Sequence, residues 1–182
     1  MARVRLVTTS DAEGDAREIF AAMEKQGTEI LNLYRALANS PAALRNVLRL
    51  GTSLLAYGQL PPRLRELAIL RIAQMTGADY EWAHHVPIAK QVGVTEEQIN
   101  SLKQWEAHDF FDDRDRALLL YVETVTRDVS VPNDVFRAAR ANLSEGEIVE
   151  LTVVCGYWGM AARILRALEI EIEPDFQQYL PA

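Results

Sequence analysis

The chain has 182 residues, of which 49% are hydrophobic, and it carries a formal net charge of −7 at pH 7. A chain of this length can bury about 70% of its unfolded surface in one domain, and its apolar content excludes general disorder. The acidic balance argues against a nucleic-acid-binding face, because neutralising phosphates requires clustered lysines and arginines.

The sequence also argues against a membrane-spanning or a secreted protein. No uninterrupted apolar run approaches the roughly 20 residues that a membrane-spanning helix requires. The first residues, MARVRLVTTSDAEGDA, lack the apolar segment of a signal peptide, so we expect a cytoplasmic protein. The single cysteine, Cys155, cannot form an intramolecular disulfide.

Signals that start helices recur along the whole chain. Thr95 with Gln98, and Ser144 with Glu147, match the capping box, in which two side chains satisfy the first free amides of a helix. Other candidate caps are Ser10 or Asp11, Ser40 before Pro41, and Asp112 or Asp113. The predicted helices cover 11–25, 28–38, a segment from 41, 62–76, a segment from about 79 to 92, 95–106, 112–127, a short segment after 132, and 145–168.

The chain has no stretch of alternating β-branched residues that would indicate a strand, and no Ser- or Gly-rich linker that would indicate a second domain. We therefore predict an all-α protein with about eight helices, forming a single domain over 1–182. Gly156 and Gly159 interrupt the last long helix, and we expect them to allow close helix packing.

The predicted helix 62–76, PRLRELAILRIAQMT, is apolar around most of its circumference, so we expect it to lie at the centre. Glu66 shares a face with Ile69, Leu70 and Ala73, and should point toward packed material. Two interpretations remain open. Glu66 is either a first-turn acid that is partly solvated, or a buried carboxylate that needs a partner.

The next helix contains the stretch GADYEWAHHVPIAKQ, whose chemistry is unusual for a core helix. Glu81 and His85 are four residues apart, so their side chains meet on the inward face. A carboxylate beside an imidazole fixes the imidazole tautomer and forms a usable proton-transfer unit, although a purely structural pair has the same spacing. Pro87 predicts a kink that leaves room for a ligand, and His84 is expected to be exposed.

Other kinds of site find less support. Glu81, His84 and His85 do not share one face, and no HExxH or Cys-rich spacing occurs, so we predict no metal. Cys155 lies in the apolar run LTVVCGYWGMA and is expected to be a small core residue. No Gly-rich phosphate loop is present, and we expect no cofactor.

The stretch RELAILRIAQMTGADYEWAHHVPIAKQVGVTEEQI resembles the core of the carboxymuconolactone decarboxylase family, which shares the alkylhydroperoxidase D-like helical fold. The resemblance is strongest over 61–102, and the segment 145–170 is similar to the other core helix of longer members. It implies a family core over about 45–170 with a helical N-terminal extension over 1–45.

The peroxidase branch of this family uses a glutamate, a Cys-x-x-Cys pair and a histidine. On this sequence the glutamate falls on Glu66 and the histidine on His85, whereas the two cysteine positions fall on Ala78 and Glu81. The resemblance therefore implies the fold but disfavours a dithiol peroxidase. This sequence is similar to the decarboxylase branch in a different respect. That branch also lacks the dithiol and keeps a glutamate and a histidine four residues apart, as Glu81 and His85 stand here.

We therefore expect a cofactor-free lyase or proton-transfer enzyme that acts on a small organic acid or lactone. His85 would transfer a proton, Glu81 would orient the imidazole, and Glu66 would tune it from the adjacent helix. Arg71 or Arg65 would hold a substrate carboxylate. The apolar walls would come from Tyr80 and Trp82, with Tyr34 and Trp158.

A non-catalytic helical oligomer or small-ligand binder is the alternative, with Glu81 and His85 as a structural pair. The family resemblance implies a homo-oligomer, since dimers, trimers and hexamers are all represented. The apolar segment 145–168 agrees with this, because it is apolar on more than one face.

Overall fold

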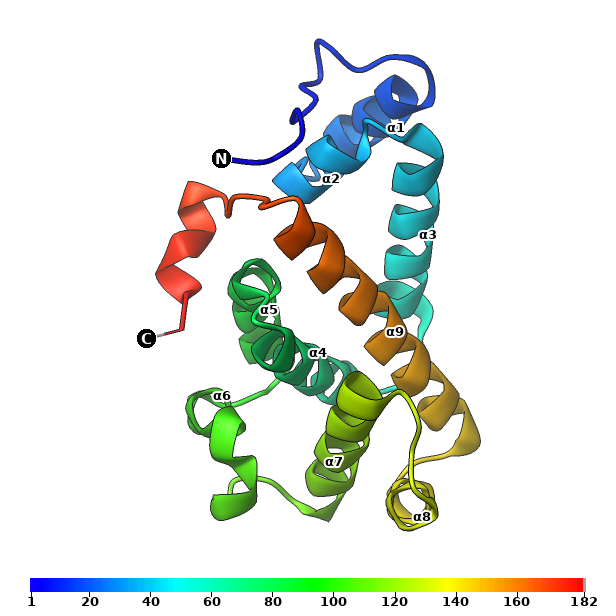
Figure 1. The fold of residues 1–182 in the computed structure, drawn as a ribbon, viewed down its shortest axis with the longest axis vertical. Coiled ribbons are helices and arrows are strands. Elements are labelled where there is room, and N and C mark those ends of the chain that lie inside the picture. Colours follow the sequence, from blue (N-terminus) through cyan, green and yellow to red (C-terminus); the bar gives the residue numbers. More distant parts are fainter. Residues whose placement is uncertain (182) are drawn as a thin grey trace.

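Helix α4 (Pro62–Thr76) lies at the centre of the molecule, as its nearly continuous apolar surface predicts. The computed structural model describes residues 1–181, and all regular secondary structure in this range is helical (Figure 1). Helices α5 (Asp79–Gln91), α7 (Asp113–Asp128) and α9 (Glu145–Ala167) pack around α4. The all-α prediction is confirmed.

Residues 1–181 form nine α-helices and two short 3-10 helices, slightly more than the expected eight. Helices α2 and α6 are shorter than the predicted segments 28–38 and 95–106, with six residues each, and η2 has no predicted counterpart. The remaining elements are α1 (Gly14–Lys25), α2 (Asn32–Leu37), α3 (Pro41–Tyr57), α6 (Glu96–Ser101), η1 (Leu102–Ala107), α8 (Asn133–Asn142) and η2 (Pro174–Tyr179).

Three of the predicted helix starts are confirmed by their hydrogen bonds. Both capping boxes form, at Thr95 of α6 and at Ser144 of α9, and the Asp112 side chain accepts from the amide of Asp115 at the start of α7. The cap predicted at Ser10 or Asp11 is wrong, since α1 begins at Gly14 after an uncapped Glu13. The chain turns at residues 9–11 instead.

Helix α9 is long and apolar enough to cross a membrane by length and composition alone. Half of its most apolar stretch is nevertheless buried inside the protein, where it packs against α4 and α7. Its buried positions include Leu151, Cys155 and Trp158, which belong to the main core. The position and packing of α9 are therefore those of a core helix.

The N-terminal segment forms a second, smaller core of its own. Phe20 of α1 and Leu44 of α3 are fully buried there. Helix α3 then runs alongside α9, so that α2 and α3 cover α5 and α9 on one side of the molecule (Figure 1). This covering layer provides one wall of the cavity described below.

The C-terminal segment was not predicted to be structured, yet η2 packs against α5 (Figure 1). Helix α5 continues through Pro87 to Gln91, and its imidazole His84 stacks on Phe176 of η2 with ring centroids 3.9 Å apart. The prediction that His84 is exposed is therefore wrong: only 8% of its surface is accessible. A helical wheel uses only the residues of one helix, so it could not show that a segment about 90 residues later in the chain covers this face of α5.

Close approach between α3 and α9 depends on Gly51. A Cβ atom at this position would overlap the hydroxyl of Tyr157, which donates a hydrogen bond to the carbonyl of Val47 at 3.0 Å. Gly156, which we expected to allow close packing, is exposed and has nothing within 4 Å of the place where its Cβ would lie. The expectation is therefore wrong for Gly156. The close contact between α3 and α9 is made at Gly51 of α3 instead.

These two glycines give a matched pair of substitutions. Gly51→Ala should lower the free energy of unfolding by about 1–3 kcal/mol, because the new methyl group displaces Tyr157. Gly156→Ala should raise it by up to about 1 kcal/mol, since alanine favours the helix and meets open space. Urea unfolding of both variants measures the difference, and equal effects would contradict the role assigned to Gly51.

Candidate active site

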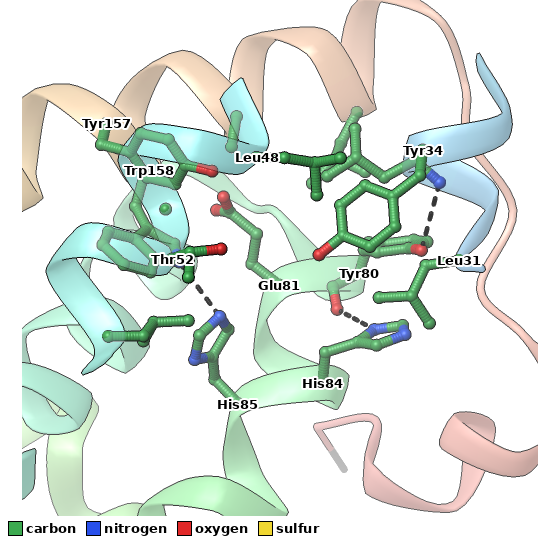
Figure 2. A pocket seen from close by; sticks show the side chains of 15 residues that line it. Leu31, Tyr34, Leu48, Thr52, Tyr80, Glu81, His84, His85, Tyr157 and Trp158 are labelled. Carbon is green, nitrogen blue, oxygen red and sulfur yellow. Dashed lines mark hydrogen bonds between the residues drawn. The ribbon is translucent and has the colours of Figure 1, made fainter. Parts of the chain in front are cut away.

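A cavity of about 130 Å³ lies between α2, α3, α5 and α9, behind the covering layer formed by α2 and α3. Most of its wall is apolar or aromatic, and a few polar groups point into it, as is usual for small-molecule sites. Figure 2 shows side chains from both halves of the chain meeting around it. The lining residues include Leu31, Tyr34, Leu48, Thr52, Tyr80, Glu81, His84, His85, Tyr157 and Trp158.

Glu81 is the most unusual group in this wall. Its side chain is buried, with 4% of the residue accessible, and neither carboxyl oxygen has a hydrogen-bond partner within residues 1–181. Burial raises the pKa of Glu81 to about 9, so the carboxyl group is protonated and neutral at pH 7. In Figure 2 the group points into the cavity, toward Tyr157 and Thr52. It is therefore a neutral acid that can donate a hydrogen bond to a ligand.

His85 lines the same cavity but bonds to other residues. Its Nδ1 lies 2.7 Å from a carboxylate oxygen of Glu66 on α4, and its Nε2 accepts a hydrogen bond of 3.0 Å from the indole of Trp158 on α9. The acceptors and donors fix the tautomer, with the proton on Nδ1 and a lone pair on Nε2. The predicted contact between Glu81 and His85 is absent from this arrangement, because Glu66 takes the place expected for Glu81.

Glu66 is fully buried, so the interpretation of a partly solvated first-turn acid is wrong. One of its oxygens receives the His85 bond, and the other lies 3.3 Å from Nε of Arg65. Arg65 is itself buried and also donates to the carbonyl of Leu54 at 3.3 Å. A buried carboxylate requires such partners, and here a guanidinium and an imidazole supply them.

His84, which also lines the cavity, is held by a second set of contacts. Its Nδ1 lies 2.8 Å from the carbonyl oxygen of Tyr80, and its Nε2 lies 2.9 Å from a carboxylate oxygen of Glu173, a close contact without good hydrogen-bond alignment. Both ring nitrogens of His84 therefore lie close to oxygen atoms. The site therefore contains two histidines in different environments.

Glu173 connects three parts of the chain at the edge of the cavity. It accepts hydrogen bonds from the amide of Asn32 at 2.6 Å and from the hydroxyl of Tyr80 at 2.7 Å. Burial alone would raise the pKa of Glu173, but the close contact with His84 and the hydrogen bonds from Asn32 and Tyr80 outweigh burial and lower it. Glu173 is thus held as a carboxylate that orders Tyr80 and the start of α2.

Two residues predicted to bind substrate lie elsewhere. Arg71 pairs with Glu123 of α7, with 2.6 Å between nitrogen and oxygen, and does not line the cavity. Trp82 is buried in the main core on another face of α5. Tyr80, Tyr34 and Trp158, which were expected to form apolar walls, do line the cavity. The packing of α4 directs Arg71 and Glu66 to different neighbours.

Cys155 is buried in the main core, and burial raises the pKa of its thiol to about 12. At neutral pH it is a protonated, unreactive thiol, in agreement with its interpretation as a small core residue. No three His, Cys, Asp or Glu side chains within residues 1–181 are grouped in a way that could hold a metal ion.

Sequence reasoning missed Thr52, Tyr157 and Glu173. Each lies on a segment far from α5 along the chain, so only the packing of α3, α9 and the C-terminal segment brings them to the cavity. A weak signal existed for Thr52, because it lies one turn after Leu48 on the face of α3 that turns toward α9. No local signal marked Glu173.

The fold and the cavity place the chain among all-α proteins of the alkylhydroperoxidase D-like class. Residues 41–124 match the model of the carboxymuconolactone decarboxylase family. The match begins within α3 and includes α4 and α5, and therefore Glu66, Glu81 and His85.

Similar proteins match parts of this chain in sequence or in fold. The uncharacterized protein YdfG of Bacillus subtilis (strain 168) is 30% identical over 92 residues, which is 50% of this chain and only 63% of that protein's length. An Agrobacterium tumefaciens protein of unknown function, named in relation to the antioxidant defence protein AhpD, has a TM-score of 0.71 at 28% identity, covering 75% of this chain and 94% of that one.

A third similar structure covers nearly the whole chain. The debrominase Bmp8, whose variant was solved in complex with 2,3,4-tribromopyrrole, has a TM-score of 0.81 at 19% identity, covering 97% of this chain and 94% of its own. At this identity the likeness concerns the fold. It extends the shared architecture to the N-terminal helices and to the C-terminal segment.

The protonation of Glu81 gives a measurable pH dependence of stability. The pKa of Glu81 rises from 4.5 to about 9 on folding, so between these pH values the folded protein holds a proton that the unfolded chain has lost. The Glu81 contribution is therefore fully present below pH 4.5 and is lost as the pH rises toward about 9.

Relative to Glu81→Gln, the free energy of unfolding of the wild type should fall by up to about 1.4 kcal/mol per pH unit in this window. Other groups titrate alike in both proteins and cancel in the difference. Urea unfolding at pH 5, 6, 7 and 8 measures it, and a constant difference would show that Glu81 is ionised in the folded state.

Proposed function

We propose that the chain is a cofactor-free acid–base enzyme of the carboxymuconolactone decarboxylase family, acting on a small, uncharged oxygen-containing molecule such as a lactone. The observation that carries this proposal is Glu81, a buried carboxyl group without a partner that points into a cavity. Leaving a buried acid unpaired costs stability, and such costs concentrate at sites that bind or react.

Charge favours a lactone over a free organic acid. No lysine or arginine lines the cavity within residues 1–181, and Arg71 is paired with Glu123. A carboxylate placed beside Glu81 would be buried without a counter-charge, which costs several kcal/mol. The reacting part of the substrate is therefore neutral when it enters.

The arrangement supports a proton transfer with two separate partners. The neutral carboxyl group of Glu81 donates a hydrogen bond to the carbonyl oxygen of the substrate and makes the neighbouring C–H more acidic. Nε2 of His85 removes that proton, and the resulting imidazolium is stabilised by the carboxylate of Glu66. In a β,γ-unsaturated lactone the product of this step is a conjugated dienolate, and return of the same proton to its γ carbon moves the double bond without consuming another reactant; in a saturated lactone the proton returns to the same carbon.

In this mechanism the roles differ from those expected from the sequence. Glu66 orients and charge-stabilises the imidazole, and Glu81 acts on the substrate oxygen. The substrate carbon must take the place of the Trp158 indole as the partner of Nε2, because the two nitrogens lie 3.0 Å apart. A dithiol peroxidase remains disfavoured, since the sequence has a single cysteine.

Small-ligand binding without turnover is the second candidate function. It is favoured by one observation: both nitrogens of His85 already have protein partners, so the imidazole is satisfied without a substrate. In that case Glu81 would serve as a hydrogen-bond donor that selects neutral ligands.

Deuterium exchange separates the two functions. A panel of γ- and δ-lactones, saturated and unsaturated, is incubated with the protein in D2O, and NMR follows deuterium entering the carbon next to the carbonyl. The wild type should catalyse exchange or double-bond movement. Glu81→Gln and His85→Ala should each lower the rate by about 100-fold or more, the usual contribution of a general acid or base.

Cys155→Ala is the matched control, because it changes a buried side chain outside the cavity and should keep most of the activity. Lactones that bind in a thermal-shift assay, with no exchange above the buffer rate, would support the binding function instead. Full activity in both the Glu81 and the His85 variants would rule out the mechanism.

We also propose a cytoplasmic homo-oligomer that associates through α3 and α9. Both helices carry exposed apolar side chains, among them Leu50 and Leu55 on α3 and Val149 and Val153 on α9. Light scattering on a gel-filtration column should give a mass above that of one chain, and Val153→Asp should lower it. A monomeric wild type at micromolar concentration would contradict this proposal.

A further inference from the structure

A second hollow adjoins the cavity on the other side of α3. It is a groove of about 510 Å³ between α1 and α3. Leu48 and Thr52 line both the groove and the cavity, and Thr52 is exposed. Figure 2 shows both side chains at the cavity wall. The groove and the cavity therefore meet along this edge of α3.

The groove contains the positive charge that the cavity lacks. Arg45 and Arg49 both line it, on the same stripe of α3 as Leu48 and Thr52. Arg45 is paired with Asp15 at 2.7 Å. Arg49 is exposed, and within residues 1–181 its guanidinium has no salt-bridge partner. One uncompensated positive charge thus lies about one helical turn from the shared edge.

Much of the remaining lining of the groove is apolar. Ile19 and Met23 of α1 form one side, and Tyr57 at the end of α3 leaves 81% of its surface exposed beside it. An alkyl chain would cover these side chains, and exposed aromatic surface of this kind is common where a ligand binds.

We propose that the groove is a substrate subsite for the carboxylate end of an elongated amphiphilic molecule, of the class of medium-chain hydroxy or oxo carboxylates. The uncharged oxygen end enters the cavity and meets Glu81. The alkyl chain passes over Leu48 and Thr52, and the carboxylate pairs with the guanidinium of Arg49. This inference rests on the proposed function for the choice of which end enters the cavity.

The orientation follows from the charges. A carboxylate in the cavity would be buried beside Glu81 with no lysine or arginine in the wall. In the groove it meets a free guanidinium and remains partly hydrated. The distance between the two ends of the ligand then sets a preferred chain length, because a short acid cannot reach both Glu81 and Arg49.

Binding measurements test this subsite independently of turnover. The probes are ω-hydroxy carboxylates and their methyl esters, titrated calorimetrically at pH 7. Chain lengths of about 4 to 12 carbons are used, on the order of the combined length of the cavity and the groove. The wild type should bind one intermediate chain length best, and the acid about tenfold more tightly than its ester. Arg49→Met should remove this preference while leaving ester binding unchanged.

Arg137→Met is the matched control, because it removes the same charge from an exposed position on α8 away from the groove. It should leave the preference for the acid intact, and Arg49→Lys should restore part of that preference. Equal binding of acid and ester by the wild type, an equal loss of both in Arg49→Met, or no binding of any probe would each overturn the subsite.

Failure of the proposed function gives a different pattern. If the protein has no proton-transfer activity but Arg49→Met removes the acid preference, the subsite stands and the chain is a binding protein. If lactone exchange is confirmed and the acid preference is absent, the proposed function stands and the groove is not part of the site.

Discussion

One buried chain of hydrogen bonds joins the three central helices. Glu66 on α4 holds Nδ1 of His85 on α5, and Trp158 on α9 donates to Nε2 of the same ring. Glu66 and Trp158 are buried and His85 is partly buried, so removing any one of them would leave a largely buried polar group without a partner. The relative positions of α4, α5 and α9 are therefore specified by polar contacts as well as by apolar packing. The same contacts fix the cavity wall that α5 and α9 form.

The same arrangement explains why Glu81 remains unpaired. The carboxylate that the imidazole needs comes from the neighbouring helix, so the acid one turn earlier on α5 has no basic partner left. Burial then keeps Glu81 protonated. Two acids of the same type, on adjacent helices, thus have different surroundings. Glu66 contacts Arg65 and His85, whereas Glu81 has no hydrogen-bond partner within residues 1–181, and this difference separates an orienting role from a donating one.

Features that depend on local sequence could be predicted, and features that depend on packing could not. The bounds of α4 and both capping boxes follow from residues within one or two turns, and the structure agrees with them. The inward direction of Glu81 and His85 follows from their spacing. The partner of His85, the burial of His84 and the position of Arg71 depend on which helix lies next to which. A single sequence does not give that arrangement.

Synthesis of the chain from its N-terminus gives Glu173 a particular consequence. Tyr80 and His84 leave the ribosome about 90 residues before the carboxylate that they contact, and the first amide of α2 precedes it by still more. During translation Tyr80 and His84, which both line the cavity, therefore lack this partner until residue 173 has been made. A nascent chain that stalls before this residue would carry the central helices, while these two side chains of the cavity wall lack the contact that orders them.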